Sequence, residues 1–318
     1  MQPGLVVKEQ SGFFWVEAAD GTVYICRLRG RLLEEAQSSD IAAIGDRVMI
    51  TILEDDEDGD KGVIELVEER SSVLSRAART EGNRGAGEAI REHVIIANAD
   101  RAFFVLAATQ PAPNLGLLDH LLAAGEAAGI EELVIVVNKV DLEDPGNIVA
   151  RFSTYEQIGY RVIYTSALWG TGINELRQML VNHLSVFTGP TGVGKSSLLN
   201  KIQPGLGRDV KSVSQATSEG VHTTRDSTLI KLEGGGYIAD TPGMRRSIML
   251  WDIEPEELDA YFIEIAPHIE DCRFRDCTHE KEPGCAVRAA VKSGAITRGR
   301  YKSYLGMRAE LEALYAVQ

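Results

Sequence analysis

The sequence is poor in the features that mark membrane, exported and uniformly basic proteins. Its longest apolar runs, such as Ala102–Ala108, are far shorter than the about 18 residues that a membrane-spanning helix needs. Met1–Phe14 lacks the basic start and apolar core of a secretion signal, so we expect a cytoplasmic protein with no membrane partner. Lys and Arg total 33 against 47 Asp and Glu, a net charge of −14, which excludes a protein that coats nucleic acid indiscriminately.

Cysteine is also scarce, and its placement is uneven. Cys26 stands alone and is expected in a core, whereas Cys272, Cys277 and Cys285 lie within 14 residues, together with His279. Without a secretion signal, clustered cysteines favour a metal site over disulfides. Three thiolates and one imidazole can close a tetrahedral site, which predicts a structural Zn²⁺. Free buried thiols or a disulfide are the alternatives.

What is present divides the chain into four segments. Residues 1–70 hold short β-type runs between turn signals, the pattern of a small barrel of the oligonucleotide-binding (OB) type. Residues 71–92 are expected to be a linker, in which arginines could contact nucleic acid. In residues 93–248, buried strand-length runs alternate with helical patterns, which indicates an α/β fold with a parallel sheet. Residues 249–318 combine the cysteine cluster with helical spacing, which predicts a small α-helical metal-binding domain.

The expected elements can be placed by residue. In the barrel they are the strands Gly12–Ala18, Thr22–Leu28, Arg47–Leu53 and Val63–Glu68. In the C-terminal segment, Leu258–Ile265 and Tyr301–Leu314 have the apolar spacing of helices.

A phosphate-binding loop is the clearest motif. The stretch from Gly189 to Ser196 fits the pattern G-x-x-x-x-G-K-[ST], between an expected strand and an expected helix. Its glycines let backbone N–H groups surround a phosphate, and the helix N-terminus adds positive potential. Lys195 would reach the β- and γ-phosphates, and the Ser196 hydroxyl would hold Mg²⁺. The expected contacts are Gly189, Pro190, Thr191, Gly192, Val193, Gly194, Lys195, Ser196 and Ser197.

A second motif selects the base. The sequence N-K-V-D directly follows the expected strand Leu133–Val137. The Asp141 carboxylate can accept hydrogen bonds from guanine N1–H and the exocyclic amine, a donor pair that adenine lacks. A Ser-Ala dipeptide after the expected strand Arg161–Tyr164 would offer a backbone N–H to guanine O6. The residues expected to hold guanine are Asn138, Lys139, Val140, Asp141, Ser166 and Ala167.

Two further segments predict the response to the γ-phosphate. Asp240 to Gly243 fits D-x-x-G at the end of an expected strand, so Asp240 would bind Mg²⁺ through water and the Gly243 N–H would sense the γ-phosphate. A threonine upstream could close over Mg²⁺ and be released after hydrolysis. We prefer Thr224 for this role, and Thr223 is the alternative.

The water-orienting group departs from the common GTPase pattern. Many GTPases carry a glutamine directly after D-x-x-G, but this chain has Met244, which can neither donate nor accept usefully. His222 is therefore the candidate for positioning water, beside Thr224 and Lys195 as catalytic residues. An exposed His222 without a catalytic role is the alternative.

The order of these motifs is permuted, because the guanine motif precedes the phosphate loop. A circular permutation keeps every contact and moves only the termini. The chain resembles the RsgA (YjeQ) family of circularly permuted GTPases that assist small-ribosomal-subunit maturation. The resemblance covers essentially the whole chain, including Val193–Asn200, the switch His222–Arg225, the barrel and the Cys/His segment.

The resemblance implies an OB-fold barrel, a GTPase core and a C-terminal zinc domain, with GTP hydrolysis stimulated by the ribosome. We expect a monomer that binds GTP with Mg²⁺, contacts the small subunit and its rRNA, and hydrolyses GTP to GDP and phosphate to drive its own release. A permuted GTPase that acts on another RNA partner is one alternative. A GTP-dependent RNA-binding module with negligible hydrolysis is another, for which Met244 is the best argument.

The acidic net charge hides a basic stretch near the C-terminus. Residues 251–270 hold seven acids and no Lys or Arg, whereas residues 288–308 hold six cations and no acid. Such a run can bind phosphate backbones with strong salt dependence. The six cations are Arg288, Lys292, Arg298, Arg300, Lys302 and Arg308, and Arg76, Arg79, Arg84 and Arg91 in the expected linker could assist them.

Overall fold

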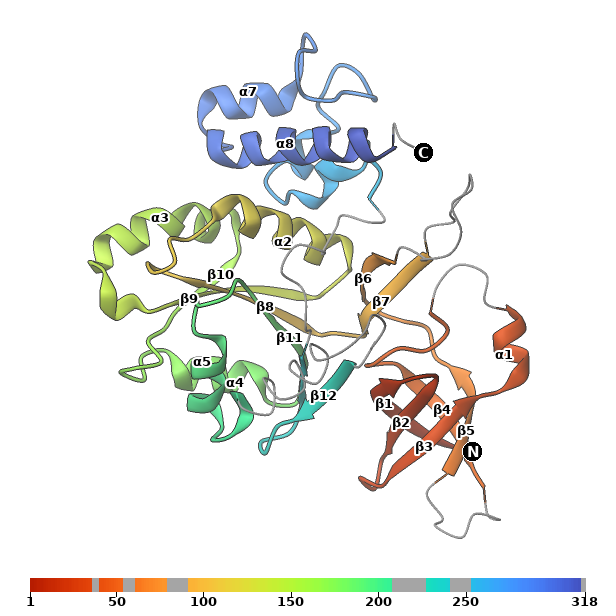
Figure 1. The fold of residues 1–318 in the computed structure, drawn as a ribbon. Helices are drawn as coiled ribbons and strands as arrows, with labels where there is room; N and C mark the ends of the chain where they lie inside the picture. Colours follow the sequence, from red (N-terminus) through yellow and green to blue (C-terminus); the bar gives the residue numbers. More distant parts are fainter. Residues whose placement is uncertain (36–39, 54–60, 79–90, 208–226, 241–252, 316–318) are drawn as a thin grey trace, which may run out of the picture.

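The computed structural model describes residues 1–35, 40–53, 61–78, 91–207, 227–240 and 253–315. The N-terminal part is a five-stranded barrel (Figure 1). Its elements are β1 (Gln2–Gln10), β2 (Phe13–Ala18), β3 (Val23–Leu28), α1 (Gly30–Glu35), β4 (Arg47–Ile52) and β5 (Lys61–Val67). The pairing runs β1-β2-β3-β5-β4 and returns to β1, which closes a barrel of the predicted OB type.

The barrel core follows from alternation along the strands. On β2, Phe14, Val16 and Ala18 are buried and the residues between them are not, which is the period of two expected for a strand with one buried face. Cys26 is buried in the same core, as predicted.

A two-stranded sheet occupies part of the predicted linker. β6 (Val73–Ala78) pairs antiparallel with β7 (Arg91–Ala97). Leu74 and Ile96 are buried in the hydrophobic cluster of the α/β core, so this part of the 71–92 segment is packed. Thr80–Gly87, the expected flexible stretch, lies outside the described residues.

The central part is the predicted α/β fold. β8 (Arg101–Ala107), β9 (Glu132–Asn138), β10 (Arg161–Tyr164), β11 (Leu184–Thr188) and β13 (Tyr237–Asp240) are parallel, and β12 (Ser227–Lys231) is antiparallel to β13. The strand order is β10-β9-β8-β11-β13-β12. Because helices cover both faces, the strands are continuous apolar runs.

The helices divide into two pairs on opposite faces of this sheet (Figure 1). The first pair is α2 (Leu115–Ala127) and α3 (Pro145–Ile158), and the second is α4 (Ile173–Leu180) and α5 (Lys195–Ile202). Local sequence sets their ends. In α3, the Asp144 side chain accepts from the Gly146 N–H, Pro145 occupies the first turn, and Gly159 ends the helix in the left-handed conformation.

Strand β1 joins the barrel to the α/β sheet. Gln2–Leu5 pair with β4, whereas Lys8 and Glu9 pair with Thr228 and Ser227 on β12. The β1–β2 register shifts between Val6 and Lys8, where a bulge redirects the strand. The two parts therefore share one 11-stranded sheet.

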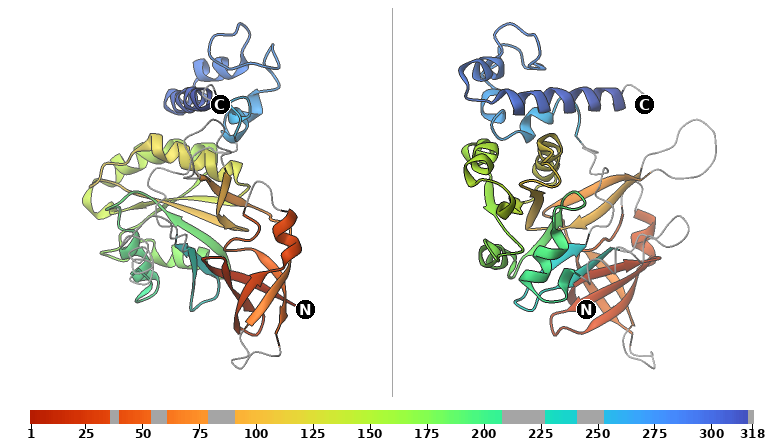
Figure 2. Two further views of the ribbon diagram at one scale, coloured as in Figure 1. Left: turned by 45° about the vertical axis from the view of Figure 1, so that its right-hand side comes forward. Right: turned by 60° about the vertical axis from the view of Figure 1, so that its left-hand side comes forward.

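The C-terminal part is small and helical, as predicted, and it sits against α2 (Figure 2). Its elements are the 3-10 turns η2 (Leu258–Tyr261) and η3 (Ala266–His268) and the helices α7 (Ala286–Ser293) and α8 (Arg298–Tyr315). The expected α-helix over Leu258–Ile265 is wrong, because the chain turns extended at Phe262 after η2. Leu258, Phe262 and Ile265 are nevertheless buried with Ala123 and Ala124 of α2, so the apolar spacing marked a buried segment rather than a helix.

No helix in the described ranges is long and apolar enough to cross a membrane.

Candidate functional site

The loop between β11 and α5 requires glycine at two positions. Gly189 has φ +152°, and a Cβ there would lie 2.1 Å from the carbonyl oxygen of Val105. Gly194 has φ +97°, and a Cβ there would lie 2.3 Å from Nδ2 of Asn138. A side chain at either position would push the loop away from the sheet.

The polar groups of this loop surround the start of α5. The Lys195 ammonium donates to the carbonyl oxygens of Gly189 at 2.6 Å and Pro190 at 2.8 Å, so it lies over its own loop. Ser196 and Ser197 are exposed in the first turn of α5, whereas Val193 is buried and anchors the loop in the core.

Asn138 connects three loops. Its side chain is buried, its Nδ2 donates to the Val193 carbonyl oxygen at 2.8 Å, and its Oδ1 accepts from the Ala167 N–H and the Thr165 hydroxyl, both at 3.2 Å. Lys139 adds a second link, because its ammonium donates to the Gly192 carbonyl oxygen at 2.6 Å. The structure therefore brings the two halves of the permuted motif set together at the carboxyl ends of β9, β10 and β11.

Asp141 is held at the edge of this site. The buried Ser166 hydroxyl donates to its carboxylate at 2.5 Å and accepts from the Trp169 N–H at 3.2 Å. Asp141 itself stays partly exposed. Sequence reasoning used Ser166 only for its place beside Ala167 and missed that its hydroxyl orients the carboxylate.

Some predicted site residues cannot be placed. Asp240 ends β13, which runs parallel to β11, so its backbone lies on the neighbouring strand. The side chain of Asp240 lies outside the described part of the chain. So do His222, Thr223, Thr224, Gly243 and Met244.

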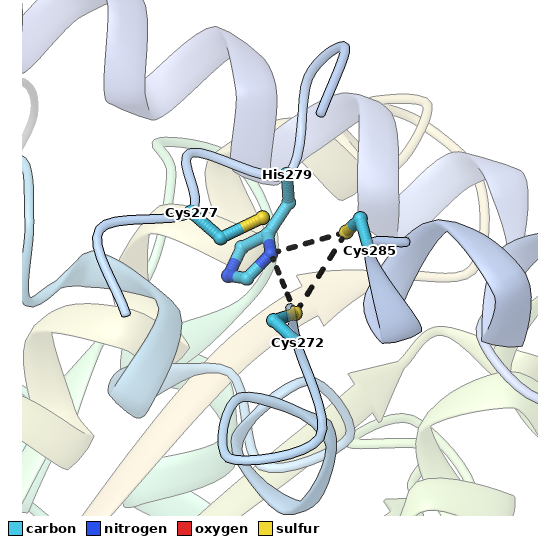
Figure 3. Close-up of side chains that lie close together, drawn as sticks. All are labelled: Cys272, Cys277, His279 and Cys285. Atoms are coloured by element: carbon cyan, nitrogen blue, oxygen red, sulfur yellow. Dashed lines mark hydrogen bonds between the residues drawn. The ribbon is translucent and has the colours of Figure 1, made fainter. Parts of the chain in front are cut away.

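The four predicted metal ligands converge in the C-terminal part (Figure 3). The donor atoms of Cys272, Cys277, His279 and Cys285 all lie within 4.8 Å of one another, and this group could hold a metal ion. Nδ1 of His279 lies 3.4 Å from Sγ of Cys285 and 3.6 Å from Sγ of Cys272, and the two sulfurs are 3.9 Å apart.

The thiols differ in their ionisation. Burial raises the pKa of Cys277 to about 12, and the sulfurs of Cys285 and Cys272 add to the rise. Burial also opposes ionisation of Cys272, but backbone N–H groups of Val287 and Ala286 help to outweigh it and its pKa is lowered. Three adjacent thiols would repel one another if all of them ionised, so a cation between them is the natural partner of the deprotonated donor set.

Two of the six cations predicted to face RNA are buried. Arg300 forms ion pairs with Asp119 at 2.7 Å and Glu264 at 2.6 Å, and its side chain is 3% exposed. Arg308 is buried and donates to the Pro255 carbonyl oxygen. The prediction was wrong for these two, because they lie on the buried stripe of α8 with Tyr304. The exposed cations of this stretch are Arg288, Lys292, Arg298 and Lys302.

Two family models match the chain: the RsgA GTPase over residues 67–250 and the RsgA N-terminal domain over residues 3–64. The chain belongs to the RsgA GTPase family. It is therefore a GTP-hydrolysing enzyme, with a circularly permuted GTPase core between the barrel and the C-terminal part.

Relatives match this RsgA-family chain along nearly its full length. It is 43% identical to the small ribosomal subunit biogenesis GTPase RsgA of Moorella thermoacetica, with 98% of this chain and 97% of the relative covered. It is 40% identical to the protein of that name from Gemmatimonas aurantiaca, with 97% of each covered. Among solved structures, YjeQ from Thermotoga maritima is 35% identical with a TM-score of 0.74, covering 98% of each chain. YloQ, described as a circularly permuted GTPase, is 30% identical with a TM-score of 0.72, covering 98% of this chain and 96% of its own.

Proposed function

We propose that this GTPase binds the small ribosomal subunit, assists its late maturation, and hydrolyses GTP to GDP and phosphate to drive its own release. The names of the full-length relatives support the ribosomal part of the proposal. The OB-type barrel supports contact with RNA. The observation that carries the nucleotide part is the link through Asn138 between the phosphate loop and the guanine motif.

We assign the guanine base to the site at Asp141. The carboxylate would accept from guanine N1–H and the exocyclic amine, and the Ser166 hydroxyl would keep it oriented. The Ala167 N–H, which donates to Asn138 Oδ1 in this structure, would donate to guanine O6 in the complex. Asp141→Asn should weaken GTP binding strongly and permit binding of xanthosine triphosphate, whose base carries a carbonyl acceptor in place of the exocyclic amine of guanine. Asp276→Asn, on an exposed residue of the C-terminal part, is the control and should change neither affinity.

The phosphates belong over the loop of residues 189–197. Lys195 would exchange its loop carbonyl acceptors for β- and γ-phosphate oxygens, and the exposed Ser196 hydroxyl would meet Mg²⁺. When bound, Mg²⁺ would supply positive charge that offsets the negative charge of the phosphates. Thr224 and Asp240 complete the proposed Mg²⁺ site, and the Gly243 N–H would meet the γ-phosphate.

His222 stays a prediction as the residue that orients water. His222→Ala should lower subunit-stimulated turnover far more than GTP affinity, because water positioning acts on the transition state. Equal turnover in the variant and the unsubstituted chain would exclude the role.

We infer that the C-terminal cluster binds zinc. A tetrahedral ion with Zn–S bonds of about 2.3 Å and a Zn–N bond of about 2.1 Å places two sulfurs about 3.8 Å apart and a sulfur about 3.6 Å from the nitrogen. The separations of 3.9, 3.6 and 3.4 Å agree with those edges. Four protein ligands leave no open position, so the ion would be structural.

We propose that rRNA docks on the exposed cations of α7 and α8. Arg298 and Lys302 lie one helical turn apart on the outer face of α8, away from the buried stripe. Reversing both charges should weaken subunit binding, flatten its salt dependence and leave GTP affinity unchanged.

GTP turnover measured with small subunits, with large subunits and alone tests the main proposal. We expect strong stimulation by small subunits only. Equal stimulation by both subunits would contradict the assignment of partner, and GTP binding without turnover in every condition would leave only an RNA-binding module.

A further inference from the structure

A buried carboxylate stands directly behind the histidine of the metal cluster. Asp259 lies on η2, thirteen residues before Cys272, and is 8% exposed. Its Oδ2 is 2.9 Å from Nε2 of His279, whose side chain is fully buried. Since an ionised carboxylate only accepts hydrogen bonds, this contact places the hydrogen on Nε2.

The opposite ring nitrogen faces the sulfurs. Nδ1 of His279 is the atom 3.4 and 3.6 Å from Cys285 and Cys272, so with the hydrogen on Nε2 its lone pair points into the cluster. We propose that Asp259 is a positioning residue for the metal: it fixes the tautomer and the orientation of His279 and increases the basicity of Nδ1. This inference rests on the proposed metal site.

The rest of the surroundings shows that His279 is held in one conformation. Its backbone has φ +63°, which is rare for a residue other than glycine and persists only where neighbours enforce it. The Tyr304 ring lies 5.9 Å from the imidazole, and the Tyr301 hydroxyl donates to the His279 carbonyl oxygen at 2.5 Å. The two polar atoms of the ring therefore face different partners: Nε2 faces Asp259, and Nδ1 faces the sulfurs of Cys272 and Cys285.

Asp259 also links the metal cluster to the junction with the GTPase core. Leu258 and Phe262, on either side of Asp259, are fully buried in the cluster that includes Ala123 and Ala124 of α2. A metal that fixes His279 would therefore also fix η2 against α2. This hydrogen bond therefore adds a polar link between metal binding and docking of the C-terminal part to the apolar packing of Cys277 and Cys285 in the same cluster.

Zinc affinity of full-length variants tests the proposal, measured by competition with a chromophoric chelator. Asp259→Ala should weaken zinc binding by about 10- to 100-fold, the usual effect of losing a partner of a histidine ligand. Asp259→Asn should lose less, because its side-chain oxygen can still accept from Nε2–H without the charge. Glu257→Gln, an exposed neighbour on the same segment, is the matched control and should bind zinc like the unsubstituted chain.

A second readout separates positioning from general loss of structure. In the Co²⁺-loaded protein, the visible absorption bands report the ligand set. Asp259→Ala should shift the wavelengths of these bands, because the imidazole of His279 would bind the metal more weakly. Hydrogen exchange at Leu258–Phe262 should rise in the same variant. If Asp259→Ala does not fold, Asp259→Asn decides the matter through its affinity and spectrum.

The outcomes distinguish this proposal from the one on which it rests. Zinc affinity and Co²⁺ spectra identical among the Asp259 variants and Glu257→Gln would overturn the role of Asp259 and leave the metal site standing. An unsubstituted chain that binds no zinc would overturn both. Neither result bears on the guanine site, which nucleotide binding tests separately.

Discussion

The barrel and the C-terminal part join the GTPase core in different ways. The barrel joins mainly through its backbone: Lys8 and Glu9 pair with β12, the Ala97 N–H donates to the Ile44 carbonyl oxygen, and the Asn98 side chain donates to the Gly45 carbonyl oxygen. At the edge, Glu17 forms an ion pair with Lys231, and the Lys231 side chain is 58% exposed. The C-terminal part joins through buried charges. The Arg300 guanidinium pairs with Asp119 of α2 and with Glu264, and the three side chains are at most 5% exposed.

Further contacts stabilise the ion pairs of Arg300 between the C-terminal part and α2. Asp119 also accepts from the Tyr155 hydroxyl at 2.8 Å and from the Ser303 hydroxyl. The Arg300 guanidinium lies 4.5 Å from the centre of the Phe262 ring. Such a network makes one orientation of the two parts strongly preferred, because any other leaves charges buried without partners.

The two contacts with the GTPase core therefore differ in kind. The barrel continues the β-sheet of the core, whereas the C-terminal part is held against α2 by a network of buried charges. Through β1, the barrel lies one strand away from the strand that ends in Asp240: Lys8 pairs with Thr228, and Thr228 pairs with Asp240. The C-terminal part instead packs on α2, on the face of the sheet opposite α4 and α5. The barrel and the C-terminal part therefore reach the core by different routes.

Of the changes considered, loss of a metal ligand should have the largest effect on the contact between the C-terminal part and α2. Structural zinc contributes about 10–16 kcal/mol in small zinc domains, more than a domain of this size retains without it. Cys285→Ser should therefore unfold the C-terminal part locally, seen as fast hydrogen exchange in α7 and α8 while β2 and β3 stay protected. Cys26→Ala, which removes the barrel thiol, should show the reverse pattern. If hydrogen exchange in either variant rose equally in the barrel and in the C-terminal part, the two parts would not be attached to the core in different ways.

Removing Arg300 should have the next largest effect. Arg300→Ala leaves Asp119 and Glu264 buried without their cation, which should lower the free energy of unfolding by about 3–5 kcal/mol in urea titrations. Arg298→Ala, on the exposed face of the same helix, should change it by less than about 0.5 kcal/mol. If the two variants were equally stable, Arg300 would not stabilise the contact between the C-terminal part and α2.

The barrel ion pair should matter least. Glu17→Gln should change the free energy of unfolding by less than about 1 kcal/mol, because the Lys231 side chain that it leaves without a partner is 58% exposed and can be solvated. The difference should shrink at high salt, which screens the Lys231 charge. Glu233→Gln, on a nearby exposed residue, serves as the control. If Glu17→Gln lowered the free energy of unfolding as much as Arg300→Ala does, charge pairs would stabilise the two contacts with the core equally.

The same contrast explains what the sequence could predict. The phosphate loop, the guanine motif and the metal ligands are short patterns whose chemistry depends on residues close in the chain, and the structure brings each of these groups together. Strand β1 was missed, because Gln2–Gly4 and Lys8–Gln10 lack the alternation of a strand, and its pairing comes from distant segments.

The buried charges were misjudged for a similar reason. The partners of Arg300, Asp119 and Glu264, are 181 and 36 residues away in sequence. A local count of charges therefore placed Arg300 on the surface, although the spacing of Arg300, Tyr304 and Leu311 along α8 already marked one face of the helix.

Retention of the chain on small ribosomal subunits in different nucleotide states tests the central claim most directly. We predict that the chain co-sediments with small subunits in the presence of a non-hydrolysable GTP analogue and is released with GDP, with GTP giving release at the rate of its hydrolysis. Equal retention with the analogue and with GDP would contradict the account.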